Sequence, residues 1–165
     1  MKQWKIKSTI KEITIALVLL FILTNIISYI RAPELGSNQL PQIDAKLIDG
    51  SQFRVKKGKP LLIHFWAISC PACKLEAPNI DRVSKKYEVL TIAVNSGSDE
   101  SVKRYMQENA FSFNVLNDKD GSWAKQFKIK VYPTSFFYDP QGELRFTEVG
   151  YTTTAGLLAR FEWLE

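Results

Sequence analysis

Residues 61–78 read Leu-Leu-Ile-His-Phe-Trp-Ala-Ile-Ser-Cys-Pro-Ala-Cys-Lys-Leu-Glu-Ala-Pro, and this stretch decides the fold. Residues 61–66 are apolar apart from one histidine, which is typical of a strand buried at the centre of a sheet. Pro71 fits the first turn of a helix, because proline fixes φ there and its missing N–H is not needed. The stretch therefore predicts a strand followed at once by a helix, with Cys70 and Cys73 at the junction.

Cys70 and Cys73 form a Cys-x-x-Cys motif at the start of the predicted helix. Unpaired N–H groups and the positive end of the helix dipole favour an anion there. They lower the pKa of a thiol from about 8.5 to roughly 3.5–7.5, and the thiolate is the nucleophile. Cys73 lies nearly one turn further on, close enough for a disulfide. The motif favours thiol–disulfide chemistry, although half of a zinc ribbon or a copper site shows the same spacing.

The rest of the chain predicts strands and helices in an order that fixes the fold class. Strand–helix–strand units imply parallel pairing with right-handed crossovers, and a closing hairpin implies antiparallel addition. We therefore predict an α/β fold with a mixed central sheet flanked by helices and an N-terminal β-hairpin extension. The predicted elements are a hairpin at 45–48 and 52–55, strands at 61–66, 89–95 and 113–116, helices at 71–87, 100–109 and 122–127, a second hairpin at 135–138 and 144–149, and a final helix at 152–165.

Apolar side chains at helical spacing, together with most of the aromatic residues, predict the core. In the first predicted helix the buried face would carry Leu75, Ile80, Val83 and Tyr87, and in the last helix Leu157, Leu158, Phe161 and Leu164. The aromatic residues expected in the core are Phe111, Phe113, Trp123, Phe127, Phe136, Phe137, Phe146, Phe161 and Trp163.

Residues 13–30, ITIALVLLFILTNIISYI, are 18 residues without a charge. As a helix they span roughly 27 Å, close to the ~30 Å hydrocarbon thickness of a bilayer. Four lysines precede the run and one arginine follows it, so the positive-inside rule predicts a single-pass inner-membrane anchor. Residues 1–12 would be cytoplasmic, residues 31–41 a linker, and residues 42–165 a periplasmic catalytic domain.

Two other interpretations of the apolar run stay open. A cleaved signal peptide would have an apolar region of about 7–15 residues and small residues at the cleavage site, whereas Ser-Tyr-Ile-Arg-Ala-Pro follows here. A buried helix of the domain is the third interpretation. An extracytoplasmic location matters for the cysteines, because a bacterial periplasm is kept oxidising.

Composition excludes several classes of function. The net charge of +5 comes mostly from residues 1–31, which carry five basic and one acidic side chain, so it does not predict nucleic-acid binding. One histidine and two cysteines are too few for a closed zinc site built from those residues alone. The sequence contains no glycine-rich phosphate loop and no serine-type triad, and we expect no metal or cofactor.

Flanking residues make the Cys-x-x-Cys motif more specific. Phe65-Trp66-Ala67 precedes it, and Tyr132-Pro133-Thr134 follows much later in the chain. This pattern resembles the thioredoxin superfamily. The linker, the hairpin and Cys-x-x-Glu-x-Pro at residues 73–78 resemble its membrane-anchored TlpA/ResA branch. Within that branch, residues 64–78 are most similar to the suppressor of copper sensitivity protein D group.

The resemblance implies a thioredoxin fold and a role for each site residue. Cys70 would form a mixed disulfide with the substrate and Cys73 would resolve it, with Cys70–Cys73 as the redox disulfide. The Pro133 loop, with a cis peptide bond, would face that disulfide and hold an extended substrate. The expected substrate-binding residues are Trp66, Pro71, Ala72, Tyr132, Pro133 and Thr134. Ser69 departs from the family, in which a tryptophan commonly precedes the first cysteine.

Glu76 and His64 each have two interpretations. Glu76 matches a glutamate that borders the active site in ResA-like proteins, where it would accept a proton as Cys73 attacks; otherwise it is an exposed helix carboxylate. His64 stands where thioredoxins have a buried acid, and a neutral imidazole could transfer a proton there. Otherwise it is a core histidine hydrogen-bonded to a neighbour.

The resemblance implies a membrane-tethered periplasmic thiol–disulfide oxidoreductase that reduces protein disulfides, with a role in copper tolerance. Its expected partner is a membrane electron-transfer protein of the DsbD/ScsB type. One alternative is a thiol reductase of cytochrome c maturation. A non-enzymatic alternative is a Cu(I)-binding protein, because soft thiolates select Cu(I). The direction of electron flow is left open by the sequence.

Overall fold

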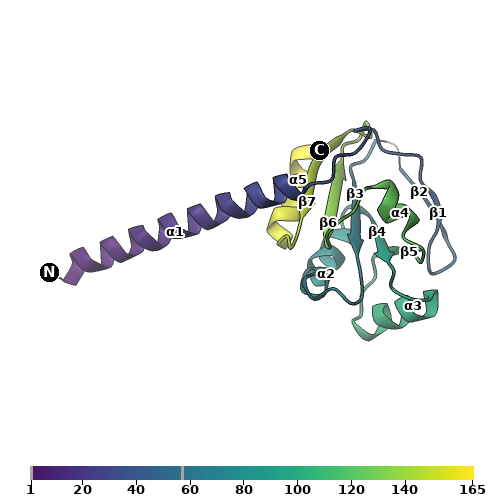
Figure 1. Ribbon diagram of the computed structural model, residues 1–165, viewed down its shortest axis with the longest axis horizontal. Coiled ribbons are helices and arrows are strands. Elements are labelled where there is room, and N and C mark those ends of the chain that lie inside the picture. The colour runs from purple at the N-terminus through teal and green to yellow at the C-terminus, as the bar shows by residue number, and fades with distance from the viewer. Residues whose placement is uncertain (1, 57) are drawn as a thin grey trace. The chain divides into compact units, whose positions relative to one another are not determined.

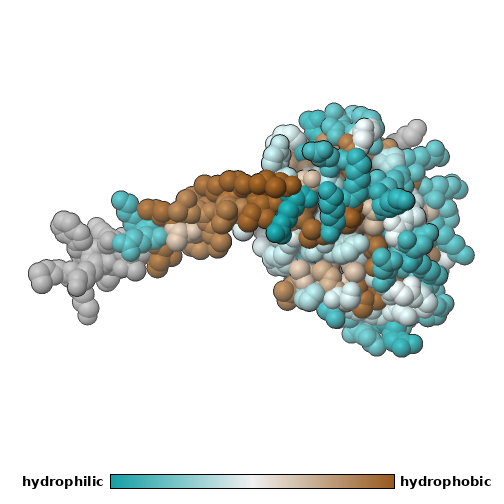
Figure 2. Space-filling view, viewed as in Figure 1, coloured by the Kyte–Doolittle hydropathy of each residue, from teal (hydrophilic) through white to brown (hydrophobic). Residues whose placement is uncertain are grey.

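The computed structural model describes residues 2–56 and 58–165, shown as a ribbon in Figure 1. The chain divides into two compact units, one ending at Arg31 and the other containing the residues that follow. The first unit is helix α1, Lys2–Arg31. Its segment Ile10–Arg31 is long and apolar enough to cross a membrane, a property that a signal sequence shares. Figure 2 shows the apolar surface along this helix in brown.

Polar side chains within α1 bond to the backbone of their own helix. The Thr14 hydroxyl donates to the carbonyl of Ile10 at 2.9 Å. Thr24 and Asn25 both donate to the carbonyl of Phe21, at 2.9 and 2.7 Å. Because hydrocarbon offers polar groups no partners, such bonds allow these residues to lie in an apolar helix.

The second unit begins with the predicted hairpin. Strands β1, Asp44–Lys46, and β2, Gln52–Arg54, pair antiparallel. Each has its central residue buried, and these residues, Ala45 and Phe53, lie opposite each other. The short strands follow the period-two alternation of a sheet with one face packed on the core. The strands are shorter than predicted, because only three residues on each side enter the ladder.

A five-stranded mixed sheet forms the centre of this unit, in the order β5-β4-β3-β6-β7. The pairs β3–β4 and β4–β5 are parallel, whereas β3–β6 and β6–β7 are antiparallel. This confirms the predicted fold class. The strands are β3 Leu61–Trp66, β4 Glu88–Val94, β5 Asn114–Asp118, β6 Thr134–Tyr138 and β7 Leu144–Val149. All six residues of β3 are buried, as expected for its apolar sequence at the middle of the sheet.

In the part of the second unit that the structure describes, four helices accompany the sheet, and three of them follow a residue whose side chain caps them. The side chains of Cys70, Ser98 and Thr153 each accept a backbone N–H of the first turn, which satisfies one of the donors left free there. The helices are α2 Pro71–Ser84, α3 Asp99–Glu108, α4 Ser122–Gln126 and α5 Thr154–Leu164.

Two hydrophobic layers cover the two faces of the sheet. One lies between the sheet and helices α2, α3 and α5, and contains Trp66, Cys73 and Phe161. The other lies between the sheet and α4 with the β1–β2 hairpin, and contains Phe65 and Phe127. Figure 1 shows α2 and α5 on one side of the sheet, and α4 with the hairpin on the other. The active-site motif therefore extends from the central strand into the first layer.

Two residues predicted for the core are exposed. Leu75 is 72% exposed and Trp163 is 64% exposed, so both predictions are wrong. Leu75 lies on the side of α2 that is turned away from the buried Ile80 and Val83. Trp163 is two residues from the buried Phe161, which places it on the opposite side of α5. The buried residues of each helix form a narrower stripe than the sequence pattern suggested.

Part of the segment predicted to be a linker is bonded to the domain. The backbone N–H of Leu40 donates to the carbonyl of Gly142, and that of Leu144 donates to the carbonyl of Asn38, both at 2.7 Å. These bonds hold residues 38–40 beside the start of β7, at the β6–β7 turn. The turn lies at the end of the sheet opposite the carboxyl end of β3, which the cysteines follow.

Candidate active site

The two cysteines lie where β3 ends and α2 begins, and they form a disulfide with a Cα–Cα distance of 5.3 Å. Cys70 caps α2, and its Sγ accepts the backbone N–H of Cys73 at 3.1 Å. Cys70 is half-buried, whereas Cys73 is buried in the layer under α2. An approaching thiol or disulfide therefore reaches the sulfur of Cys70 first.

The start of α2 supplies the electrostatics that a reactive cysteine needs. Pro71 occupies the first helical position, and the Lys74 N–H donates to the carbonyl of Cys70 at 3.2 Å. When the disulfide opens, the Cys73 N–H and the positive helix end both face the sulfur of Cys70. Such an environment favours a thiolate over a thiol. Pro71 is exposed and Ala72 half-buried beside it, so both border the disulfide.

The loop before β6 lies next to this end of β3. The Tyr132–Pro133 peptide bond is cis, as the resemblance implied. Thr134 pairs with Phe65, so the antiparallel register brings Pro133 beside Trp66. The Pro133 carbonyl accepts the N–H of Gly150 at 2.8 Å, and the Thr134 hydroxyl donates to the carbonyl of residue 131 at 2.8 Å. These two hydrogen bonds fix the loop beside the carboxyl end of β3, where the segment that leads to the cysteines begins.

Trp66 packs in the same hydrophobic layer as Cys73. Its ring is buried and lies 5.4 Å from the ring of Tyr105 and 6.1 Å from that of Phe113, measured between centroids. Its Nε1 has no hydrogen-bond partner among the described residues. Trp66 therefore acts through packing and stabilises the chain immediately before the cysteines.

Ser96 is a supporting residue that the sequence analysis missed. Its hydroxyl accepts the N–H of Ile68 at 3.1 Å and donates to the carbonyl of Val94 at 3.0 Å. These bonds hold the loop before Cys70 to the end of β4. The sequence contained a signal for this role. Ser96 follows shortly after β4, which runs parallel to β3, so it lies at the same sheet edge as the cysteines that follow β3.

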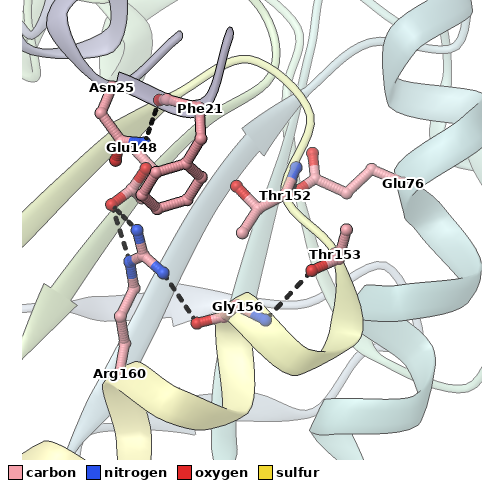
Figure 3. A network of polar contacts seen from close by, with 8 residues as sticks. All are labelled: Phe21, Asn25, Glu76, Glu148, Thr152, Thr153, Gly156 and Arg160. Carbon is pink, nitrogen blue, oxygen red and sulfur yellow. Dashed lines mark hydrogen bonds and ion pairs between the residues drawn. The ribbon is translucent and has the colours of Figure 1, made fainter. Parts of the chain in front are cut away.

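Glu76 is fully buried, so the interpretation as an exposed helix carboxylate does not hold. Its Oε1 accepts the backbone N–H of Thr152 at 3.1 Å, as Figure 3 shows, while Oε2 has no partner among the described residues. Burial raises the pKa of this carboxyl to about 8, and the nearby Glu148 carboxylate adds to the rise. Glu76 lies one helical turn beyond Cys73 on the same buried face of α2, so it holds a proton near that sulfur at neutral pH.

Glu148 makes a second set of contacts, shown in Figure 3. The guanidinium of Arg160 forms an ion pair with it, with Nε donating at 2.7 Å. Another nitrogen of Arg160 donates to the carbonyl of Gly156 at 2.8 Å, and the Gly156 N–H donates to the Thr153 hydroxyl at 3.1 Å. These contacts stabilise the first turn of α5, which follows the loop that Glu76 holds.

Asn79 also connects α2 to that loop, and no sequence pattern indicated it. Its Nδ2 donates to the carbonyl of Thr152 at 3.0 Å and to the hydroxyl of Tyr151 at 3.2 Å. Its Oδ1 accepts the hydroxyl of Thr154 at 2.8 Å. Asn79 and Glu76 thus fasten residues 151–154 to the helix that carries the cysteines. The partners lie more than 70 residues away, which is why sequence spacing cannot show them.

His64 is buried on the face of the sheet that also carries Trp66. Its Nδ1 lies 2.9 Å from the hydroxyl of Ser135, which is its partner across the β3–β6 pair. Desolvation lowers the pKa of the imidazole to about 3, so it is neutral at physiological pH. This environment fits the second interpretation of the residue, a core histidine bonded to a neighbour, better than that of a base.

The described residues contain no group of three or more His, Cys, Asp or Glu side chains placed to hold a metal ion. The two sulfurs are therefore the candidate ligands for the Cu(I) alternative. The same sulfurs form the disulfide, so copper binding and redox chemistry would compete for them.

Comparisons with known proteins agree with this site. The model of the AhpC/TSA family matches residues 32–147. The chain is 30% identical to sporulation thiol-disulfide oxidoreductase A of Bacillus subtilis, covering 73% of this chain and 76% of that protein. It is also 30% identical to thiol-disulfide oxidoreductase ResA of Oceanobacillus iheyensis, covering 64% of this chain and 58% of that protein.

A solved structure shows the same likeness in three dimensions. The crystal structure of StoA from Bacillus subtilis superposes with a TM-score of 0.66 at 26% sequence identity. The match covers 78% of this chain and 99% of that one.

Proposed function

The chain belongs to the AhpC/TSA family and is a thioredoxin-like thiol–disulfide oxidoreductase related to ResA and StoA, and on this premise we propose that it reduces protein disulfides outside the cytoplasm. The observation that carries the proposal is the pairing of a half-buried Cys70 at the cap of α2 with a buried Cys73. One sulfur is accessible to a substrate, and the other can reach only its partner.

The proposed reaction transfers two electrons from the dithiol to a substrate disulfide. The Cys70 thiolate attacks one substrate sulfur, so a Cys70–substrate bond forms and the other substrate sulfur leaves as a thiolate that takes up a proton. The Cys73 thiolate then attacks Sγ of Cys70, which forms the Cys70–Cys73 disulfide and releases the second substrate thiolate. The substrate gains the two electrons that the dithiol loses, and its two thiolates take up protons from solvent.

Glu76 exchanges a proton with Cys73 in this proposal. In reduced protein whose Glu76 is ionised, the carboxylate accepts the thiol proton as Cys73 attacks Cys70. The oxidised protein then holds that proton on Glu76, and the substrate thiolates take their protons from solvent. The pKa of about 8 supports a carboxyl that is protonated in the disulfide form at neutral pH. When a donor dithiol later opens the disulfide, Cys73 leaves as a thiolate and takes the proton back.

A membrane dithiol protein of the DsbD/ScsB type would be the donor that regenerates the reduced form. The α1 helix supports this location, because it is long and apolar enough to anchor the domain in an inner membrane with its catalytic unit in the periplasm. We propose copper-damaged disulfides as its substrates, on the resemblance to the suppressor of copper sensitivity protein D group that residues 64–78 suggest from sequence.

The test is a single-turnover experiment on the full chain in detergent micelles. The protein is reduced, freed of reductant and mixed with a peptide that carries one disulfide, and both are alkylated at intervals for mass spectrometry. The proposal expects one peptide disulfide reduced for each Cys70–Cys73 disulfide formed. Unchanged peptide, with both thiols still free on the protein, would contradict it.

A further inference from the structure

We propose that the exposed face of α2 beyond the disulfide is a docking surface for protein segments whose cysteine is flanked by apolar and acidic residues. This inference rests on the proposed function and names the substrate class of the same site. The surface consists of Pro71, Lys74, Leu75, Pro78 and Arg82 of α2, together with Tyr151. We call it the α2 face.

The apolar part of the α2 face runs directly from the reactive sulfur. Pro71, Leu75 and Pro78 are all exposed and lie at positions i, i+4 and i+7, which share one side of a helix. Leu75 is 72% exposed, although a leucine is normally placed in the core. Because Pro71 follows Cys70, a substrate that reaches this sulfur contacts the row.

Tyr151 extends the apolar surface from a different element. It is 53% exposed, and its hydroxyl accepts a hydrogen bond from Asn79, which lies one turn beyond Leu75 on α2. The preceding residue, Gly150, donates to the carbonyl of Pro133. The aromatic ring thus stands beside the helix and close in sequence to a segment bonded to the Pro133 loop, so the surface is continuous with the expected substrate groove.

The charges on this side of α2 have one sign. Lys74 and Arg82 are exposed, and no acidic side chain of the described residues pairs with either. The two acidic residues of the helix, Glu76 and Asp81, are both buried. Asp81 is bound to Lys85 at 2.8 Å and accepts the N–H of Ser112. Helix α2 therefore presents apolar groups and positive charge, which favours a partner with apolar and acidic groups.

The size of the surface favours a polypeptide over a small thiol. From Pro71 to Pro78 the helix rises about 10 Å, at 1.5 Å per residue. Tyr151 and Arg82 extend the surface further. A protein segment can reach Leu75, Tyr151 and Lys74 while its cysteine meets Cys70, whereas a small disulfide covers only the sulfur itself.

The test uses three matched peptides, each closed by one disulfide, with the flanking residues as the only difference. One carries leucine and aspartate, the second leucine and lysine, and the third glycine and aspartate. The reduced full chain in micelles is mixed with each, and the second-order rate of Cys70–Cys73 formation is measured. Hydroxyethyl disulfide serves as a substrate too small to contact the α2 face.

We expect the leucine–aspartate peptide to react about tenfold faster than either of the others. Leu75→Ser should remove the advantage of leucine, and Lys74→Glu should reverse the preference for aspartate over lysine. Each variant's peptide rates are divided by its own rate with hydroxyethyl disulfide, which removes any direct effect of the substitution on Cys70. Trp163→Ser removes a similarly exposed aromatic from α5 and should change none of these rates.

Equal rates for the three peptides would overturn the proposal that the α2 face docks substrates, while leaving the proposed function standing. So would a loss in Trp163→Ser as large as that in Leu75→Ser. Failure to reduce hydroxyethyl disulfide as well as all three peptides would instead overturn the proposed function, and the docking surface with it.

Discussion

The carboxyl of Glu76 accepts the backbone N–H of Thr152 at 3.1 Å, across 76 positions of sequence. This bond joins the helix that carries the cysteines to the loop between β7 and α5. The same loop reaches the Pro133 carbonyl through the N–H of Gly150. A single buried carboxyl of the redox helix is thus bonded to the loop that also contacts the Pro133 loop. Its protonation state affects stability and, in the proposed reaction, the exchange of a proton with Cys73.

Replacing Glu76 with glutamine should flatten the dependence of stability on pH. The folded chain holds the Glu76 proton up to about pH 8, whereas the unfolded chain releases it near pH 4.5. The folded state therefore binds more protons in this window, and its stability falls as the pH rises from about 4.5 to 8. The cost at pH 7 is on the order of 3 kcal/mol, which glutamine avoids while still accepting the Thr152 N–H.

Thermal unfolding of the oxidised full chain between pH 4.5 and 8.5 measures this effect. Glu76→Gln should gain stability relative to the wild type as the pH rises. Glu108→Gln, which removes an exposed carboxyl from α3, is the matched control. Parallel curves for the wild type and Glu76→Gln would show that Glu76 is ionised in the folded state.

His64 should remain neutral throughout the physiological range. It is the only histidine in the chain, so its imidazole signals in an NMR titration are unambiguous. With a pKa near 3 in the folded state and about 6.5 in the unfolded state, it contributes stability that is present above pH 6.5 and is lost as the pH falls toward 3. Its resonances should not move between pH 5 and 8, and a midpoint near 6.5 would show an accessible base instead.

Asn79→Ala should loosen residues 151–154 without unfolding the chain. The substitution removes three hydrogen bonds to that segment, worth about 1 kcal/mol each in net terms, so stability should fall by about 1–3 kcal/mol. Amide exchange at Gly150 and Thr152 should accelerate. Asn109→Ala, which removes a single bond to a carbonyl at the end of α3, should leave exchange at those amides unchanged. Equal acceleration in both variants would indicate a general loss of stability.

Replacing each cysteine separately should give variants that differ in how much mixed disulfide they accumulate. Cys73→Ser keeps the accessible nucleophile and should accumulate a mixed disulfide with a substrate peptide, because no sulfur remains to resolve it. Cys70→Ser should give less than a tenth of that adduct, since Cys73 is buried. Intact-mass measurement after reaction distinguishes the two. More adduct on Cys70→Ser than on Cys73→Ser would reverse the assigned roles.

Local sequence was sufficient for most of the fold. The apolar run at 61–66 predicted β3 with the observed bounds, Pro71 marked the start of α2, and the helix predicted at 100–109 is α3, shifted by one residue. These signals depend on neighbouring residues, through strand burial and helix capping. The helix after Cys70 ends at Ser84, three residues before the predicted end.

Long-range contacts account for what the sequence could not predict. Glu76 is buried because a loop more than 70 residues later covers it, and Asn79 was missed for the same reason. Leu75 fitted a helical apolar pattern, but among the described residues its side chain stays 72% exposed. Residues 38–40 were predicted to be part of a linker, and their hydrogen-bond partners in the β6–β7 turn lie about 100 residues later in the chain.

The measurement that tests the central claim most directly is the reduction potential of the Cys70–Cys73 pair. The full chain in micelles is equilibrated with defined ratios of reduced and oxidised dithiothreitol or glutathione, and the free thiols are trapped and counted. A reductase should give a value near that of thioredoxin, about −270 mV. A value near that of the oxidant DsbA, about −120 mV, would contradict the account, because such a disulfide would oxidise substrates instead of reducing them.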